Sequence, residues 1–158
     1  CTPFPDCQSC IFNSKCLAFK KNKVDLIPIK TQKKKIRNRY FNYLVFKDNS
    51  GKTFINQRTE KDIWYKLYQF PLIEKDVLVD DILLSSDFSE YLKNNKLKIS
   101  NTKHKIIRYK HVLSHQHLFI AFYLINLNTV INDGYYISNL NDFTFPVPIS
   151  NFISKYLI

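Results

Sequence analysis

The stretch KIIRYKHVLSHQHLFIAFYLINL, at residues 105–127, decides the fold. Two parts of it, residues 105–113 and 118–127, are rich in β-branched and aromatic residues, which favour strands. The polar sequence SHQH separates these two parts. We therefore expect a hairpin or a pair of neighbouring strands here, and a sheet as the main element of the fold.

An earlier stretch has the same character. Residues 39–46 read RYFNYLVF, residues 47–51 (KDNSG) have the composition of a turn, and residues 52–57 (KTFINQ) alternate as a returning strand does. The pattern predicts a hairpin over residues 39–57. Near the end of the chain, Gly134 opens a turn into the short sequence YYIS.

Helical spacing is confined to short segments. Residues 87–94 (DFSEYLKN) place Phe88, Tyr91 and Leu92 on one face of a helix, and PISNFISKYLI, from Pro148, has proline at a helix start. A helical turn is also expected over residues 16–21. The expected order is loop, linker and then β-β-α-β-β-β-α, which is an α+β fold.

The charge of the chain favours a polyanionic partner. Its 158 residues carry 24 Lys and Arg against 13 Asp and Glu, a net charge of +11. Nucleic acid and an anionic membrane surface both fit this charge. Part of the positive charge is not taken as evidence of binding, because a composition rich in Lys, Asn, Ile, Tyr and Phe is also typical of an AT-rich genome.

Two further features of the sequence bear on the cellular compartment of the protein and on whether the chain is a fragment. No apolar run approaches the roughly 20 residues of a membrane span, and the start lacks the order of a signal peptide, so a cytosolic protein is expected. The sequence begins at Cys1 and contains no Met. It is therefore expected to be a fragment of a longer protein.

All the cysteines lie in the first tenth of the chain with the spacing C-x5-C-x2-C-x5-C, namely Cys1, Cys7, Cys10 and Cys16. Four thiolates this close together can surround a tetrahedral metal or the corners of a cubane cluster. This spacing predicts a metal site, with zinc and an iron–sulfur cluster both possible. After it, residues 24–38 hold Pro28 and a run of Lys and Arg, which indicates a basic linker.

The cysteine loop CTPFPDCQSCIFNSKC resembles the [4Fe-4S] loop of MutY-type adenine DNA glycosylases and of endonuclease III-type glycosylases. The family has six residues in the first gap, whereas this sequence has five. The segment QRTEKDIWYKLYQFPLIE (57–74) also resembles the MutY family, whose C-terminal domain has a Nudix-like fold, a mixed sheet flanked by helices. The family pattern W-x-G-L-(W/Y)-x-F-P is matched at five positions, Trp64, Leu67, Tyr68, Phe70 and Pro71.

At the glycine position of that pattern this sequence has Lys66, so the loop is not expected to use a left-handed backbone freely. Trp64 and Phe70 are expected to be core aromatics, in preference to direct DNA contacts.

A second resemblance lies in HVLSHQHLFIAFYL (111–124), which is similar to the F-S-H loop of the MutY family, with Leu113 at the Phe position. The resemblance implies that Ser114 and His115 contact 8-oxoguanine while Leu113 wedges beside the base. Such a role is chemically reasonable, because 8-oxoguanine differs from guanine at N7-H and O8, and a hydroxyl can donate or accept a hydrogen bond.

The resemblance implies three parts: an iron–sulfur loop (1–23) that closes a helix-hairpin-helix domain, a basic linker (24–38), and a Nudix-like 8-oxoguanine-recognition domain (39–158). The parent protein would remove adenine mispaired with 8-oxoguanine or guanine in base excision repair, as a monomer in the bacterial cytoplasm. Its catalytic Glu and Asp would lie upstream of Cys1, leaving none here. The linker residues expected on DNA phosphates are Lys33, Lys34, Lys35 and Arg37, although a solvated tether is the alternative.

Two other functions stay open at this point. A Nudix hydrolase needs the pattern G-x5-E-x7-R-E-x2-E-E to hold magnesium, and this chain has only Glu60, Glu74 and Glu90, widely spaced. A zinc-bound interaction module is the other, with the basic stretch serving protein or RNA partners.

Overall fold

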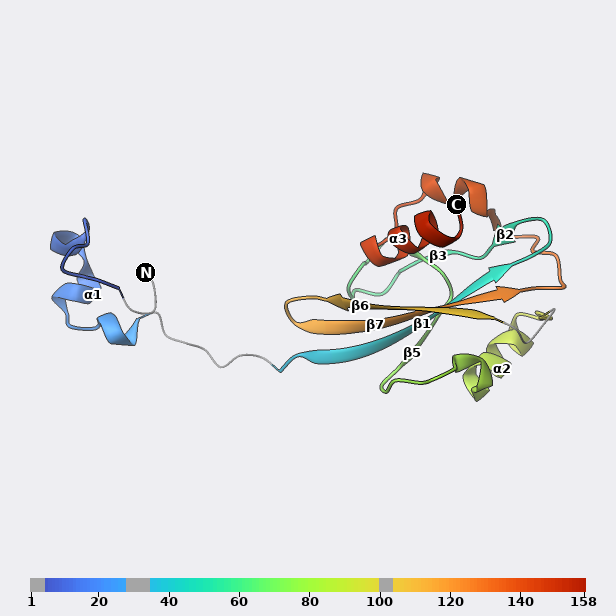
Figure 1. Ribbon diagram of the computed structural model, residues 1–158, viewed down its shortest axis with the longest axis horizontal. Coiled ribbons are helices and arrows are strands. Elements are labelled where there is room, and N and C mark those ends of the chain that lie inside the picture. The colour runs from blue at the N-terminus through green and yellow to red at the C-terminus, as the bar shows by residue number, and fades with distance from the viewer. Residues whose placement is uncertain (1–4, 28–34, 100–103) are drawn as a thin grey trace. The chain divides into compact units, whose positions relative to one another are not determined.

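A computed structural model of the chain describes residues 5–27, 35–99 and 104–158 (Figure 1). The chain divides into two compact units, Cys1–Lys35 and Ile36–Ile158. The first unit contains the 3-10 helices η1 (Asn13–Lys15) and η2 (Val24–Leu26) and the one-turn helix α1 (Leu17–Lys20). The helical turn expected over residues 16–21 is therefore confirmed. None of these elements contains a buried residue.

The second unit is built on a mixed four-stranded sheet with the order β5-β1-β7-β6. Its strands are β1 (Arg37–Lys47), β5 (Leu72–Lys75), β6 (Lys105–Val112) and β7 (Gln116–Asn126). β1 runs antiparallel to β5 and parallel to β7, and β6 runs antiparallel to β7. The strand pair expected over residues 105–127 is confirmed, and so is the mixed character of the sheet.

The hairpin expected over residues 39–57 is wrong. The returning segment forms two short strands, and β2 (Lys52–Thr53) pairs with β8 (Tyr135–Tyr136), whereas β3 (Asn56–Gln57) pairs with β4 (Tyr68–Gln69). Both edges of β1 are already occupied by β5 and β7, so no edge remains for a returning strand. The carboxylate of Asp48 fixes the turn, accepting hydrogen bonds from the backbone N–H groups of Ser50, Lys52 and Ile131.

Two helices cover opposite faces of the sheet (Figure 1). α2 (Ser86–Asn94) follows the 3-10 helix η3 (Ile82–Leu84) and is capped by Ser85, whose Oγ accepts from the N–H of Phe88 at 3.2 Å. α3 (Val147–Tyr156) follows the 3-10 helix η4 (Ile137–Asp142) and has proline in its first turn. Both helices confirm the helical spacing of the sequence.

The alternation of β1 creates two cores. Phe41, Tyr43 and Val45 point to the α3 side, whereas Leu44 and Phe46 point to the α2 side, and all five are buried. Phe152 of α3 and Phe88 of α2 complete the respective clusters. Within the described parts of the chain, no helix has the length and apolar character needed to cross a membrane.

Candidate nucleic-acid interface

The predicted recognition residues lie in the turn between β6 and β7. Leu113 N donates to Gln116 O at 2.9 Å and closes the turn, and the side chains of Ser114 and His115 are exposed. The N–H of Arg37 donates to the carbonyl of His115 at 3.2 Å. The beginning of β1 is therefore bonded to this turn, which brings Arg37 close to the backbone of the two exposed polar residues.

Leu113 is placed differently from its two neighbours. Its side chain is half-buried and packs against the core on the α3 side of the sheet. His111, two residues earlier, lies beside Trp64, with 6.0 Å between the ring centroids. The turn is thus anchored by apolar contacts on the α3 side and presents its polar residues to solvent.

The predicted phosphate-binding residues are only partly brought to this site. Arg37 is the first residue of β1 and is exposed. Lys35 is exposed too, but it belongs to the first unit. Lys33 and Lys34 lie outside the described residues.

Three of the four cysteines belong to the described part of the first unit. Cys1 lies outside the described residues, Cys7 and Cys16 are half-buried, and Cys10 is exposed. Burial raises the pKa of the Cys7 thiol, and the nearby Cys16 and Cys10 add to this effect. Across residues 5–27, 35–99 and 104–158, no three His, Cys, Asp or Glu side chains are arranged to hold a metal ion.

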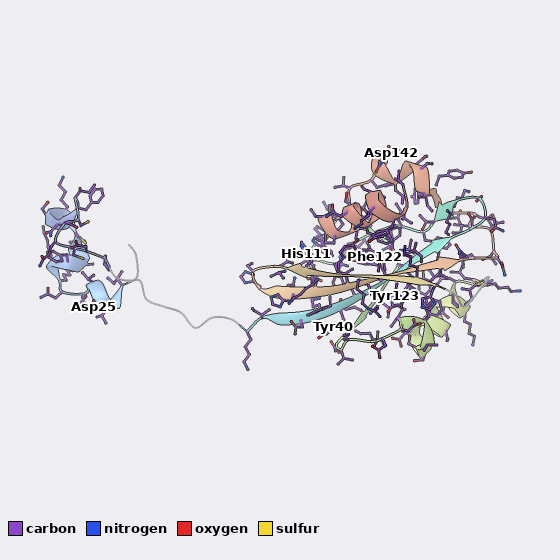
Figure 2. All side chains as sticks on the ribbon, in the orientation of Figure 1. Asp25, Tyr40, His111, Phe122, Tyr123 and Asp142 are labelled. Atoms are coloured by element: carbon purple, nitrogen blue, oxygen red, sulfur yellow. The ribbon has the colours of Figure 1, made fainter. Side chains whose placement is uncertain are left out.

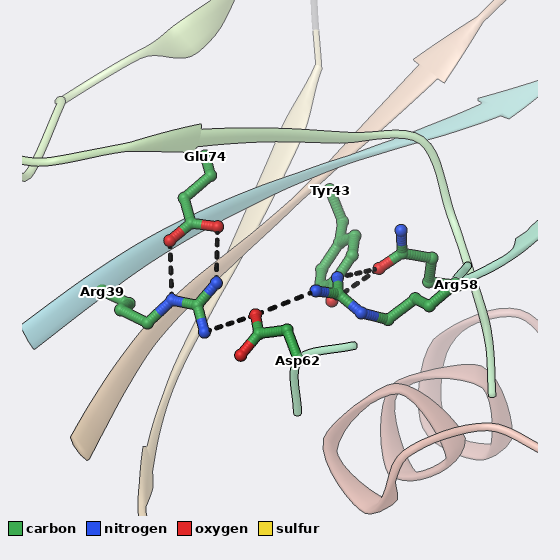
Figure 3. A network of polar contacts seen from close by, with 6 residues as sticks. Arg39, Tyr43, Arg58, Asp62 and Glu74 are labelled. Carbon is green, nitrogen blue, oxygen red and sulfur yellow. Dashed lines mark hydrogen bonds and ion pairs between the residues drawn. The ribbon is translucent and has the colours of Figure 1, made fainter. Parts of the chain in front are cut away.

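Two buried arginines, Arg39 and Arg58, and their partly exposed carboxylate partners form a network beside the sheet (Figure 3). Arg39 of β1 makes a bidentate pair with Glu74, at 2.7 and 2.8 Å, and its Nη1 lies 2.7 Å from Asp62. Arg58 reaches the same Asp62 carboxylate at 3.3 Å and donates to Gln69 at 2.7 Å. The hydrogen bond from Arg39 lowers the pKa of Asp62, and the bond to Glu74 raises the pKa of Arg39.

Sequence reasoning missed this network. The sequence does place a charged residue, Arg39, directly before the apolar run of β1. If that guanidinium is buried, it requires carboxylate partners. The partners come from β5 and from the loop after β3, so the sequence alone does not identify them.

The loop that carries Asp62 has an unusual backbone. Trp64 and Lys66 have φ angles of 62° and 65°, so both are left-handed. The expectation for Lys66 is therefore wrong: the loop adopts this conformation without glycine. The N–H of Lys66 donates to Arg58 O at 2.9 Å and the N–H of Arg58 donates to Leu67 O at 2.9 Å, and these bonds hold the closed loop.

Trp64 and Phe70 are core aromatics, as expected. Phe70 is fully buried, and Trp64 packs half-buried against the core on the α3 side. The Trp64 ring meets Phe41 edge-on, with 5.9 Å between centroids.

A cavity of about 560 Å³ lies between the β3–β4 region and α2. Of the three glutamates, Glu60 and Glu74 are among its lining residues, together with Arg58 and Gln69. The Glu74 carboxylate is already engaged by Arg39. A magnesium site of the kind that a Nudix hydrolase requires is not formed by the described residues.

Comparison with known proteins places these features in context. Residues 42–155 match the NUDIX domain family. An adenine DNA glycosylase of Buchnera aphidicola subsp. Schizaphis graminum is 30% identical over 165 residues, which cover 99% of this chain and 45% of that protein. A second adenine DNA glycosylase, from Buchnera aphidicola subsp. Baizongia pistaciae, is 25% identical over 96% of this chain and 42% of its own length. The chain thus spans less than half the length of these relatives.

Solved structures are similar at a lower level. A crystal structure of a MutT protein from Methanosarcina mazei Go1 has a TM-score of 0.49 and 13% identity, over 80% of this chain and 95% of that one. A solution structure of the E. coli ORF135 protein has a TM-score of 0.49 and 8% identity, over 77% and 90% of the two chains.

Proposed function

The chain belongs to the NUDIX domain family, and we propose that it serves as the lesion-recognition and DNA-binding part of an adenine DNA glycosylase. The observation that carries the proposal is the β6–β7 turn, where Ser114 and His115 are exposed at the end of two paired strands. The similarity to two adenine DNA glycosylases over nearly the whole chain supports it.

The proposed reading of the lesion uses hydrogen bonds. The Ser114 hydroxyl can donate to O8 or accept from N7-H of 8-oxoguanine, and the imidazole of His115 offers one donor and one acceptor when neutral. Because guanine lacks both lesion groups, a contact made to them discriminates directly between the two bases. In the proposed site, the buried part of the Leu113 side chain packs against the core on the α3 side, and its exposed part lies beside the base.

The parent reaction that we propose is removal of adenine mispaired with 8-oxoguanine or guanine, in base excision repair in a bacterial cytoplasm. The proposed partners are duplex DNA and a catalytic domain, which supplies the general acid, and the protein would act as a monomer. Arg37 and Lys35, with Lys33 and Lys34, would contact phosphates and add affinity without sequence information.

We further propose that the cysteine loop binds a [4Fe-4S] cluster through Cys1, Cys7, Cys10 and Cys16. The support is their spacing and the similarity to the glycosylases. The cluster would be structural. Purified protein should be brown and absorb near 400 nm, and substitution of Cys10 by Ser should reduce the absorbance and the bound iron. Colourless protein with stoichiometric zinc would contradict the cluster.

The experiment for lesion reading compares two duplexes that differ only in 8-oxoguanine or guanine opposite adenine. Their binding to the 158-residue chain is followed by fluorescence anisotropy. The chain should prefer the oxidised duplex by about fivefold or more, since one desolvated hydrogen bond contributes about 1 to 3 kcal/mol.

The double variant Ser114→Ala plus His115→Ala should bind both duplexes equally, with an unchanged salt dependence. Ser138→Ala, an exposed serine in η4, serves as the matched control and should keep the preference. Equal binding of the two duplexes by the unmodified chain would sink the proposal.

A further inference from the structure

The fold leaves one long strand at the border of the sheet. β6 is the last strand in the order β5-β1-β7-β6 and has eight residues. It pairs with β7 along one side, and in the parts of the chain that the structure describes no strand pairs with its other side. Figure 2 labels His111 on this strand, near the turn to β7. The outer side of β6 is therefore a row of backbone groups with which a further strand can pair.

The turn to β7 determines which backbone groups of β6 point outward. Leu113 N donates to Gln116 O, so these two residues form a hydrogen-bonded pair. In an antiparallel ladder, hydrogen-bonded and non-hydrogen-bonded pairs alternate. The residues of β6 whose N–H and C=O groups turn away from β7 are therefore Ile106, Arg108, Lys110 and Val112. None of these groups makes a hydrogen bond to another backbone group of the described residues.

The side chains along this outer side are basic and apolar. Arg108 and Lys110 are exposed, and neither forms an ion pair with a described carboxylate. Arg108 donates to the backbone carbonyl of Asp80, and the Lys110 ammonium lies 5.4 Å from the centroid of Phe119. These neutral partners leave both positive charges in place. β6 contains no acidic residue, and Val112 at its end is 60% exposed.

These charges argue against a second copy of the chain as the occupant. Two β6 strands that pair antiparallel with each other must match their outward-facing residues. When all four residues are matched, Arg108 of each copy lies opposite Lys110 of the other. A shift by one pair in either direction places Arg108 opposite Arg108 or Lys110 opposite Lys110. Like charges directly opposite each other destabilise an antiparallel pair, so each of these overlaps is disfavoured.

We propose that the outer side of β6 binds an extended acidic segment of another protein, which adds an antiparallel strand to the sheet. The carboxylates of this segment stand at alternate positions, opposite Arg108 and Lys110. Apolar side chains flank them, opposite Ile106 and Val112. The segment thus has acidic residues two positions apart between two apolar ones. This binding goes beyond the DNA-binding function proposed above.

The backbone of β6 distinguishes a peptide from a nucleic acid as the occupant. Each outward-facing residue presents one donor and one acceptor, and a peptide in an extended conformation supplies both in the same alternation. A phosphate chain supplies only acceptors, so it would bind the lysine and arginine side chains and leave the four outward carbonyls without donors.

The test titrates the 158-residue chain into a fluorescein-labelled peptide of nine residues and follows fluorescence anisotropy. Valine, glutamate, glutamate and valine stand at alternate positions of this peptide, with threonine elsewhere. The glutamate peptide should bind saturably. The same peptide with lysine in place of both glutamates should bind about fivefold or more weakly, because two attractive cross-strand pairs become repulsive. Equal binding of the two peptides would overturn the proposal.

A third peptide keeps the charges and removes hydrogen bonds. N-methylation of both glutamates blocks the two N–H groups that would donate to the carbonyls of Arg108 and Lys110. Binding should weaken by about fivefold or more, the effect of two backbone hydrogen bonds. If the methylated peptide binds as well as the glutamate peptide, the contact is one of charge alone and no strand is added.

A charge exchange tests the register. Lys110→Glu should weaken binding of the glutamate peptide by about two- to fivefold. Antiparallel pairing places the first glutamate of the peptide opposite Lys110, so lysine at the first position, and not at the second, should restore the affinity. Lys61→Glu is the matched control, since it changes the net charge equally at an exposed residue of the loop after β3. Equal weakening by the two variants would show that only the overall charge matters.

Hydrogen exchange measured by NMR locates the peptide without any substitution. In the free chain, the N–H groups of Arg108 and Lys110 should exchange rapidly, whereas that of Tyr109 lies in the ladder with β7 and should be protected. The glutamate peptide should slow exchange at Arg108 and Lys110. Protection confined to other strands would contradict the proposal. So would protection of Arg108 and Lys110 in the free chain that is lost on dilution, which would indicate a second copy.

The outcome is independent of lesion reading. The double variant Ser114→Ala plus His115→Ala keeps the backbone of β6 and should bind the glutamate peptide as the unmodified chain does. Lys110→Glu should keep the ratio of affinities for the two duplexes. Failure of the lesion-reading proposal would therefore leave this surface intact, and the reverse also holds.

Discussion

Lys66 shows at the scale of one residue that a pattern of side chains does not fix the backbone. Its φ of 65° is left-handed, a conformation that costs an L residue about 1 to 2 kcal/mol. Glycine at this position removes that cost but adds about 0.5 to 1 kcal/mol of unfolded-state entropy.

Lys66→Gly should therefore stabilise the protein by about 0.5 to 1 kcal/mol, measured by urea denaturation. Lys66→Ala keeps the left-handed cost and should show no gain. A destabilised glycine variant would mean that contacts of the lysine, such as its ammonium 5.5 Å from the Tyr65 centroid, outweigh the backbone term.

Asp48 gives a prediction about pH. Burial opposes its charge, but hydrogen bonds from Ile131, Lys52 and Ser50 together lower its pKa from 3.8 to about 2. A lowered folded-state pKa contributes stability above the unfolded pKa, and this stability is lost as the pH falls from about 4 to about 2.

Asp48→Asn should destabilise the protein at pH 6, because an amide nitrogen would face the N–H of Ile131. The difference between variant and unmodified protein should shrink as pH falls to 2, measured by thermal unfolding at each pH. The control Asp133→Asn, an exposed aspartate, should show no such change. A constant difference across this range would show that Asp48 does not act through its charge.

At the scale of elements, local signals were sufficient for some structures and not for others. The β6–β7 strands, α2 and α3 were predicted because periodicity, caps and a short turn are local. The hairpin predicted over residues 39–57 was wrong because the choice of strand partner is not local. Both edges of β1 pair with other strands, β5 and β7.

The loop after β3 is held by charges that no local pattern reveals. Asp62 is shared by Arg39 and Arg58, whose side chains are 7% and 6% exposed. Asp62→Ala leaves both guanidinium groups with fewer partners and should destabilise the protein by about 1 to 3 kcal/mol. Glu60→Ala, an exposed neighbour, is the control in chemical denaturation and should have little effect. Equal effects of the two changes would show that the pairs with Asp62 contribute nothing.

At the scale of the molecule, the candidate site could be predicted from a resemblance. The contacts that hold the site in place could not be predicted. The positions of Ser114 and His115 follow from a motif between two strands. The bond from Arg37 N to the turn and the burial of Leu113 depend on strand register, which arises only when distant segments pair.

The two units allow a prediction for the whole chain. Both hydrophobic clusters consist entirely of residues from Ile36–Ile158. A protein of residues 36–158 should therefore unfold cooperatively, with a thermal midpoint within a few degrees of that of the full chain. A loss of cooperative unfolding on removal of residues 1–35 would show that the first unit is needed for the fold.

The parallel pairing of β1 with β7 sets the order of events in folding. The Tyr123 hydroxyl and Asn42 meet across 81 residues, whereas a three-residue turn joins β6 to β7. Closing the long loop costs chain entropy before any contact compensates for it, so we expect the β6–β7 ribbon to form early and β1 to dock late. Ile107→Ala in β6 should slow refolding, whereas Val45→Ala in β1 should mainly accelerate unfolding. The turn that carries Ser114 and His115 should thus be among the first parts of the protein to acquire its shape.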